Sequence, residues 1–324
     1  MKISNDNKIF FLPVNTGYGI DGIPDERLIK FHSDRSGNGI YCSLVGNVVV
    51  PHGYGSNNSC LYISKDKEWM SVSKAIKDKG SIPGIQLSST WPEYKGNKNF
   101  VSSSKLDIDN YQNIVKDIST NSIDKLLYNL QKGIELSISN GFRHIQIHAA
   151  HGYLISLLID KLFCDNYQYM LKRLREIISI YKNVVETSLR FSLLIGVQNL
   201  DKQRSEFFKE LNELSFDFFD ISFGFYNINK NMIYPESTSM LKSRLNNSLD
   251  LINDYKSTNF ILSGRSLYWY DGQLPENAHL GICRDLIANP EFITNKNNKC
   301  DQCGDCHYYS RGENSLTCSK WNLG

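Results

Sequence analysis

The sequence lacks the features that would place it in a membrane, outside the cell or on nucleic acid. It has no run of about 18 apolar residues, so we expect no membrane-spanning helix. Its start, MKISNDNK, does not lead into the long apolar core of a secretory signal peptide. The 36 Lys and Arg residues nearly balance 34 Asp and Glu residues and are scattered, which gives no argument for a nucleic-acid partner. We therefore expect a cytoplasmic, reducing location, in which free cysteines persist.

Four of the eight cysteines lie close together near the end of the chain, at Cys300, Cys303, Cys306 and Cys318. The first three are separated by two residues each, so they can converge on one centre if the chain loops around it. Three thiolates from a tight loop and a fourth from a distance favour an iron–sulfur cluster. A structural zinc site is the first alternative, although zinc motifs more often consist of two CxxC pairs. Disulfides are the second and weakest alternative, because cysteines so close in the sequence would form strained pairs.

Short apolar runs recur along the chain and predict the fold. They cover residues 8–13, 40–50, 81–88, 144–150, 187–193, 218–224, 259–264 and 278–284. Such runs are typical of parallel strands that are covered on both faces. Amphipathic helical patterns lie between several of them, at residues 122–140, 170–181 and 204–214. Eight strands with interleaved helices predict a (β/α)8 barrel, the TIM-barrel fold. A doubly wound open sheet is the alternative, but no GxGxxG motif follows any of the runs.

The chain divides into a barrel and a short tail. Its 324 residues, 41% of them hydrophobic, can bury the core of one large barrel. The Asn- and Lys-rich stretch at residues 295–299 lies between the last apolar run and the cysteine pattern. We therefore expect a barrel of residues 1–294 and a cysteine-rich, cluster-binding tail of residues 295–324.

The fourth apolar run leads into two histidines and a tyrosine. In a TIM barrel the chemistry takes place where the strands end at their C-terminal edge. His148 and His151 could hold a carbonyl oxygen there and stabilise negative charge that develops on it. Tyr153, with an ordinary pKa of about 10, could donate a proton to a carbon atom. Two other interpretations of the histidines stay open: they satisfy the backbone at a strand–helix turn, or they bind a metal.

Other strand ends carry groups that suit an anionic ligand. The third run contains Gln86, and the fifth contains Arg190, which needs an anionic or electron-rich partner because an isolated buried charge is costly. The seventh run ends at Gly264 and Arg265, and the eighth ends at Arg284. Each arginine alone could be a surface ion pair. Together, a glycine that permits close approach and arginines with planar forks favour a phosphate, which barrels often bind at this place.

Three motifs in the same order resemble the old yellow enzyme family of FMN-dependent ene-reductases. The HxAHGYL sequence of that family is present as HAAHGYL at residues 148–154, and its GRxLxANP segment as CRDLIANP at residues 283–290. The CxxCxxC…C tail is similar to that of the iron–sulfur branch, which includes 2,4-dienoyl-CoA reductase and trimethylamine dehydrogenase. The resemblance covers essentially the whole chain.

The resemblance implies two cofactors, FMN and a [4Fe-4S] cluster, the latter held by the four tail cysteines. It implies FMN contacts for Pro13, Val14, Asn15, Gly46, Gln86, Arg190, Gly264, Arg265, Cys283 and Arg284. The last four of these residues would surround the phosphate, Gln86 would bond the pyrimidine edge of the ring, and Arg190 would face the N1/O2 region. His148 and His151 would hold the activating oxygen of the substrate, and Tyr153 would be the proton donor.

The implied reaction is the reduction of an activated C=C bond in a small unsaturated molecule. Hydride would come from FMN N5 and a proton from the tyrosine. Members of the iron–sulfur branch commonly carry a further C-terminal module that exchanges electrons with the cluster, whereas this chain ends six residues after Cys318. We therefore expect a separate electron-donor protein, such as a flavodoxin, a ferredoxin or a flavoprotein reductase, with NAD(P)H as an indirect donor. Direct reduction of FMN by NAD(P)H is the alternative and would leave the cluster a structural role.

The sequence also departs from the family pattern. The usual QLxHxGR reads QLSSTWP at residues 86–92, and a cysteine, Cys283, replaces the glycine before Arg284. These changes predict a reshaped substrate pocket. Oxidative demethylation of an amine is an alternative activity, for which the aromatic cage candidates are Tyr18, Trp91, Tyr226 and Trp269. A zinc-stabilised barrel without redox activity is another alternative. The histidine pair indicates an oxygen-bearing substrate and so favours ene-reduction.

Overall fold

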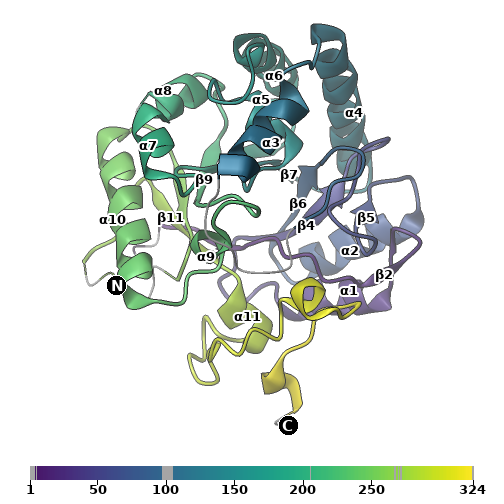
Figure 1. Cartoon of the computed structure of the whole chain (residues 1–324). Coiled ribbons are helices and arrows are strands. Elements are labelled where there is room, and N and C mark those ends of the chain that lie inside the picture. The colour runs from purple at the N-terminus through teal and green to yellow at the C-terminus, as the bar shows by residue number, and fades with distance from the viewer. Residues whose placement is uncertain are drawn as a thin grey trace.

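The computed structural model is a closed barrel of parallel strands (Figure 1). Its strands are β1 (Ile9–Phe11), β4 (Cys42–Val49), β6 (Ile82–Ser88), β7 (His144–Ala149), β8 (Glu186–Ser192), β9 (Phe218–Ser222), β10 (Phe260–Leu262) and β11 (Ala278–Ile282). Strand β1 pairs with both β4 and β11, which closes the sheet. The structure describes residues 4, 6–96, 105–204, 206–265, 268, 270 and 272–322. Each barrel strand overlaps one of the eight predicted runs, so the predicted (β/α)8 TIM barrel is confirmed.

Helices connect the strands and cover the outside of the barrel (Figure 1). The longer ones are α1 (Glu26–Asp34), α2 (Lys67–Asp78), α3 (Lys105–Val115), α4 (Thr120–Ser139), α6 (Tyr167–Tyr181) and α10 (Thr238–Asp254). The shorter ones are α5 (Leu154–Leu158), α7 (Gln198–Asp201), α8 (Phe207–Asn212), α9 (Lys230–Ile233) and α11 (Arg284–Ala288). Helices α4 and α6 confirm two of the predicted helices. In the part of the chain that the structure describes, no helix combines the length and the apolar character needed to cross a membrane.

The third predicted helix, at residues 204–214, is wrong at its start. A 3-10 turn, η1 (Lys202–Arg204), ends at Arg204, and α8 begins only at Phe207. The Arg204 side chain turns inward, where its Nε lies 2.8 Å from Asp160 Oδ2 and its Nη1 donates to the carbonyl of Leu193. Both charged side chains of this ion pair are almost completely buried. This position therefore serves tertiary structure and does not continue the regular helix.

The apolar core has two parts, one on each face of the sheet. Phe10 and Phe11 are neighbours in β1, yet they belong to different clusters of buried side chains, as expected of residues that alternate across a strand. The cluster around Phe10 is small and includes Leu44 and Ile261, whereas the cluster around Phe11 is large and includes helix residues such as Leu130 of α4. We therefore assign the small cluster to the barrel interior and the large one to the layer between the sheet and the helices.

The cysteine-rich tail packs directly on the barrel. The carbonyl of Leu316 accepts a hydrogen bond from Tyr18 Oη, and the amide of Leu316 donates to the carbonyl of Thr16. Near the end of the described chain, Trp321 Nε1 donates to the carbonyl of Ile287 in α11. Figure 1 shows this segment in yellow beside α1 and α11. Tail residues are therefore close enough to the strand ends to contribute to a site there.

A polar cluster lies where β8 begins. It is at the N-terminal edge of the barrel strands, opposite to the C-terminal edge where we expect the active site. Glu186 accepts a short hydrogen bond from the Tyr41 hydroxyl, and its other carboxylate oxygen lies 3.3 Å from His144 Nδ1. Lys8 Nζ lies 3.5 Å from the same carboxylate. Burial alone would raise the pKa of Glu186, but these hydrogen bonds and the Lys8 charge outweigh it and hold the pKa at about 2.

We expect Glu186→Gln to lower the free energy of unfolding at neutral pH. The difference from the wild type should become smaller in acid. The folded-state pKa of about 2 lies below the ordinary value of 4.5, so the carboxylate stabilises the fold above pH 4.5. That contribution declines as the pH falls from 4.5 toward 2. Because the side chain is partly exposed, we expect a difference of about 1–2 kcal/mol in the free energy of unfolding at pH 7. Urea titrations of both proteins at pH 7 and pH 3 measure it, and a difference that is the same at both pH values contradicts this account.

Candidate functional site

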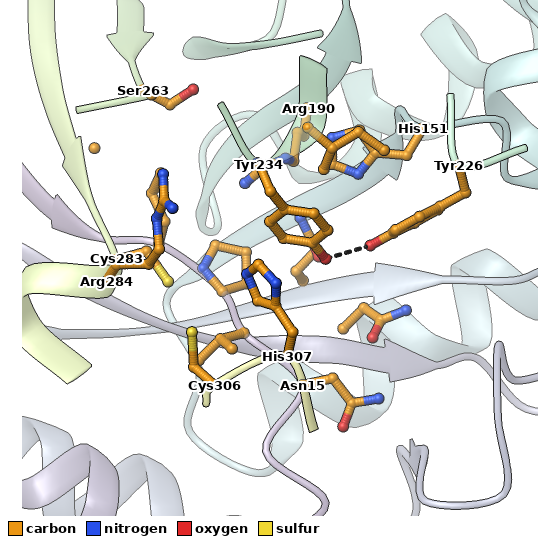
Figure 2. Close-up of a pocket in the computed structure, with 18 of the residues that line it drawn as sticks. Asn15, His151, Arg190, Tyr226, Tyr234, Ser263, Cys283, Arg284, Cys306 and His307 are labelled. Carbon is orange, nitrogen blue, oxygen red and sulfur yellow. Dashed lines mark hydrogen bonds between the residues drawn. The ribbon is translucent and has the colours of Figure 1, made fainter. Parts of the chain in front are cut away.

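A cavity of about 250 Å³ opens where the barrel strands end. Each of the eight barrel strands, or the segment directly after it, contributes to the lining: examples are Pro13 after β1, Asn47 in β4, Gln86 in β6 and Tyr226 after β9. The tail adds the segment from residue 306 to residue 310. Figure 2 shows this arrangement, with His151 and Tyr226 on one side and Cys283, Arg284 and Cys306 on the other.

Twelve of the thirteen residues that the sequence predicted to bind FMN or substrate line this one cavity. They are Pro13, Val14, Asn15, Gln86, His148, His151, Tyr153, Arg190, Gly264, Arg265, Cys283 and Arg284. Gly46 is buried behind the lining: a Cβ atom there would lie 2.8 Å from the Cβ atom of Gln86 and 3.2 Å from that of Pro13. The missing side chain at Gly46 therefore lets two lining segments approach each other. The individual roles of all these residues stay predictions.

The histidine pair is buried, neutral and oriented by its neighbours. The backbone amide of Ala150 donates to His148 Nδ1 at 3.3 Å, which leaves the ring proton on Nε2. His151 Nε2 lies 2.6 Å from Ser222 Oγ, and the two imidazole rings are 5.3 Å apart. Burial, and then the charge of Arg190, lower the pKa of both rings well below the ordinary value of 6.5. His148 therefore presents a neutral N–H donor at the strand end.

Tyr153 lies directly beside this pair. Its ring centre is 4.6 Å from that of His148 and 5.8 Å from that of Tyr226, which stacks on it. Tyr94 meets the Tyr153 ring edge-on at 5.7 Å. Burial, and then the neighbouring Tyr226, raise the pKa of Tyr153 well above 10. The phenol is therefore protonated at neutral pH and is available as a proton donor.

A chain of hydrogen bonds inside the barrel fixes Arg190. Its Nη1 donates to Asp220 Oδ2 at 3.1 Å, and its Nη2 donates to Ser222 Oγ at 3.4 Å. Asp220 is fully buried and also accepts from Gln146 Nε2, while Gln86 Nε2 donates to Gln146 Oε1 at 2.6 Å. Asp220 thus neutralises the buried arginine and joins it to Gln86. The sequence analysis missed Asp220 because a single carboxylate within an apolar run carries no periodic signal.

Three arginines meet around Gly264. Arg244 comes from α10, is 5% exposed, and donates through Nη2 to Ser263 Oγ at 3.4 Å. A Cβ atom at Gly264 would lie only 2.9 Å from that Nη2. Arg284 donates to the carbonyl of Pro235, and Arg265 to the carbonyl of Cys300. Burial, and then the charges of Arg190 and Arg284, lower the pKa of Arg244 to about 9. This end of the cavity therefore suits a doubly charged anion.

Aromatic side chains from two segments form another part of the lining. Tyr226 Oη and Tyr234 Oη lie 3.0 Å apart, and the Tyr234 ring lies over that of His307 with 4.2 Å between their centres (Figure 2). Of the four cage residues that the sequence suggested, Tyr226 lines the cavity. Tyr18 packs on Phe31 and Trp91 packs on Tyr94, so neither lines it, and Trp269 lies outside the described residues. Two of the four candidates, Tyr18 and Trp91, therefore do not contribute to an aromatic cage in this cavity.

The four tail cysteines surround a second, smaller hollow next to the first cavity. They line it together with Arg284, Ile287 and His307, and Cys306 also lines the large cavity. All four thiols are free, and burial raises the pKa of Cys306 to about 12. Across the described ranges, no group of three or more His, Cys, Asp or Glu side chains is arranged to hold a metal ion. The four cysteines thus line one hollow, and the cluster that they would hold stays a prediction.

The fold and the cavity define a TIM-barrel enzyme with a ligand site at the strand ends, and comparison with known proteins gives the family. The sequence matches the NADH:flavin oxidoreductase / NADH oxidase family over residues 18–301. The chain belongs to this family, which confirms the resemblance to the old yellow enzymes. Over 151 residues it is 27% identical to an NADPH dehydrogenase of Clostridium acetobutylicum, which corresponds to 46% of this chain and 43% of that protein.

Solved structures with the same fold share little sequence with this chain. A 2-naphthoyl-CoA reductase in complex with 2-naphthoyl-CoA superposes with a TM-score of 0.73 at 14% identity, over 97% of this chain and 54% of that one. The old yellow enzyme homologue of Zymomonas mobilis gives a TM-score of 0.65 at 15% identity, over 90% of each chain. The old yellow enzyme of Pichia sp. AKU4542 superposes with a TM-score of 0.62 at 15% identity, over 89% of this chain and 82% of that one. The chain thus spans about half the length of the reductase and less than half of the dehydrogenase.

The lining fits the flavin nucleotide that this family uses. In the described part of the chain, the buried Nε atoms of Arg244 and Arg265 have no hydrogen-bond partner, although buried polar atoms normally have one. The missing side chain at Gly264 lets the Arg244 guanidinium lie against the backbone at the end of β10, where a Cβ atom would come within 2.9 Å of its Nη2. A phosphate there would accept from these donors, and Gln86 and Arg190 would meet the polar edge of the flavin ring. The residues present therefore suit FMN, with the phosphate at the arginine end.

We expect Arg244→Met to weaken FMN binding by about 10- to 100-fold, the loss expected for one charge-assisted hydrogen bond to a phosphate. Riboflavin, which lacks the phosphate, should lose little affinity. Titration of the flavin-free protein with each compound measures the two dissociation constants, and Lys242→Met on the exposed side of the same helix is the control. An equal loss for both compounds would assign Arg244 a purely structural role.

Proposed function

We propose that the protein is an FMN- and [4Fe-4S]-containing oxidoreductase that reduces a C=C bond activated by a carbonyl group. The observation that carries this proposal is the neutral N–H donor of His148 beside the protonated phenol of Tyr153, their ring centres 4.6 Å apart in the cavity. The first group suits a carbonyl oxygen, and the second suits protonation of the neighbouring carbon. Membership of a flavin oxidoreductase family supports the redox assignment.

In this proposal the residues divide the reaction between them. His148 Nε2–H and the His151 ring bind the carbonyl oxygen and stabilise the negative charge that develops on it. When bound, FMN would supply the hydride that adds to the β-carbon of the alkene. Tyr153 donates its proton to the α-carbon and regains one from solvent, so that hydride and proton together saturate the bond. Arg190, held by Asp220, keeps a positive charge at the polar edge of the flavin site.

The charges of the cavity favour ene-reduction over the oxidation of a cationic amine. Five basic side chains line it, namely Arg190, Lys230, Arg244, Arg265 and Arg284, and Asp285 is the one acidic residue among the described lining residues. A cationic amine would be repelled by this excess of positive charge. Two of the four candidate cage residues, Tyr18 and Trp91, also do not line the cavity. An oxygen-bearing substrate is therefore the better match.

We also propose that the four tail cysteines hold the cluster and that a separate protein supplies its electrons. Support comes from their position around one hollow and from Cys306, which lines the hollow and the flavin cavity alike. Cys303 is exposed, so one edge of this site faces solvent, where a flavodoxin, a ferredoxin or a flavoprotein reductase could dock. NAD(P)H would then act through that partner.

An anaerobic half-reaction tests the proposal. The FMN-loaded protein is reduced with dithionite and mixed with enals, enones and saturated aldehydes of the same carbon skeleton. We expect the enals and enones to restore the absorbance of oxidised flavin and to be recovered as saturated carbonyl compounds, while the saturated aldehydes leave the flavin reduced. If the protein binds FMN but its reduced flavin is reoxidised only by oxygen and by none of the enals and enones, ene-reduction is refuted.

A further inference from the structure

Lys230 is a buried charged residue in the cavity that the proposed reaction does not use. It is the first residue of α9, is 3% exposed and lines the cavity. Its Nζ donates to Ser310 Oγ of the tail at 2.6 Å, so the ammonium group is held in place by a neutral hydroxyl. Burial lowers the pKa of Lys230 to about 8, which leaves it mostly protonated at neutral pH. A positioned ammonium group in a buried wall is suited to bind an anionic ligand group.

Aromatic side chains and hydroxyl groups line the cavity wall that carries Lys230. The lining near it in the chain includes Tyr226 and Tyr234 together with Ile233 and Pro235, and the tail contributes His307 next to Tyr308. The Ser310 hydroxyl, which accepts from Lys230 Nζ, is a neutral group. Burial raises the pKa of both Tyr226 and Tyr234, so both phenols are neutral too. One ammonium group beside one hydroxyl suits a carboxylate, which can accept a hydrogen bond from each of them.

A row of aromatic rings connects this wall with the histidine pair. The ring of Tyr226 lies 5.5 Å from that of His151 and 6.4 Å from that of Tyr234, which in turn covers His307. A planar ligand lying along this row would have one end at His151 and the other toward α9, which carries Lys230. Aromatic side chains favour flat, conjugated ligands through stacked and edge-to-face contacts.

From this placement we infer that the substrate is a conjugated enal or enone that carries a carboxylate at its far end, bound by Lys230 and Ser310. The carbonyl end lies on the histidine pair and the carboxylate accepts from Lys230 Nζ and from the Ser310 hydroxyl. The inference rests on the proposed function, and it adds a substrate class to it. Arg190 pairs with Asp220, and in the proposed function the arginines around Gly264 would bind the flavin phosphate, so we assign the substrate carboxylate to Lys230.

The test uses two substrates that differ in one charge, 4-carboxycinnamaldehyde and its methyl ester. With dithionite-reduced holoenzyme, the wild-type protein should have a kcat/KM for the acid that exceeds that for the ester by about 10-fold or more, as one charge-assisted bond provides. Lys230→Met should lower this ratio by about 10- to 100-fold, and Lys230→Arg should restore part of it. Lys209→Met, an exposed lysine on α8, is the control that should keep the wild-type ratio.

A second readout is the binding of 4-carboxybenzaldehyde, which has no alkene to reduce, to the oxidised holoenzyme by calorimetry. Lys230→Met should weaken the binding of 4-carboxybenzaldehyde more than it weakens the binding of the uncharged methyl 4-formylbenzoate. A wild-type enzyme with no preference for the acid, or a preference that Lys230→Met leaves in place, overturns the inference. A different result would overturn the proposed function on which the inference rests. That result is a protein that binds no FMN, or one whose reduced flavin is reoxidised by neither 4-carboxycinnamaldehyde nor its methyl ester. Iron and FMN contents of each variant show whether the tail and barrel are intact.

Discussion

Replacing Tyr153 with phenylalanine is expected to slow the oxidative half-reaction with an alkene by about 10²- to 10⁴-fold, the usual contribution of a positioned proton donor. The phenol is 4% exposed and its pKa is raised well above 10 by burial and by Tyr226, so it holds a proton to give. The substitution removes one oxygen atom and keeps the ring between His148 and Tyr226. FMN binding should therefore change little. Stopped-flow measurement of flavin reoxidation gives the rate.

The same assignment predicts the pH dependence of this step. A donor must be protonated to act, and the pKa of Tyr153 is raised above the ordinary value of 10, so its contribution is present below pH 10 and declines only above it. The rate should thus be flat from pH 6 to pH 9 as far as Tyr153 is concerned. Tyr226→Phe is the matched comparison, because Tyr226 is a buried phenol in contact with Tyr153. If the Tyr153→Phe variant reoxidises its flavin at the wild-type rate and the Tyr226→Phe variant does so slowly, Tyr226 is the proton donor.

Cys303→Ser is expected to remove most of the iron from the protein. Cys303 lines the small hollow with the three other tail cysteines and receives a hydrogen bond from Ser319 Oγ at 3.4 Å. Loss of one thiolate from a site that needs four should lower the iron content from about four per chain and bleach the cluster absorbance near about 400 nm. Iron and flavin analyses on the same sample measure both effects.

Cys164→Ser is the control for this change. Cys164 lies in the loop before α6 and is only 1% exposed. It lines neither the large cavity nor the hollow of the tail cysteines, so its replacement should leave the iron content as in the wild type. Iron that persists unchanged in the Cys303 variant would refute the cluster assignment. Iron lost equally from both variants would show a general effect of the substitution on folding.

The barrel was predictable because its signal is local. Strands covered on both faces are apolar throughout, and each of the eight runs contains enough such residues to be recognised without any knowledge of its neighbours. The predicted site residues come together for a related reason: in a barrel all strand ends meet at one edge, so His148 and Arg190 had to be close once β7 and β8 were recognised as neighbours.

The residues that were missed belong to segments whose position depends on tertiary structure. Arg244 lies in an amphipathic helix, where its sequence context is that of any surface arginine, and only the structure shows that its guanidinium group lies beside Gly264. Lys230 and His307 reach the cavity because α9 and the tail fold over the strand ends. Arg204, just before the helix that begins at residue 207, likewise pairs with a residue far away in the sequence, Asp160, which lies 44 positions earlier.

The measurement that tests the central claim most directly is a cofactor analysis of protein purified without oxygen. The visible spectrum is recorded, and iron, zinc and released flavin are determined on the same sample. We predict about four irons and one FMN per chain in a yellow-brown protein. Zinc without flavin in a colourless protein would contradict the account and leave a barrel that has kept the family's fold without its redox chemistry.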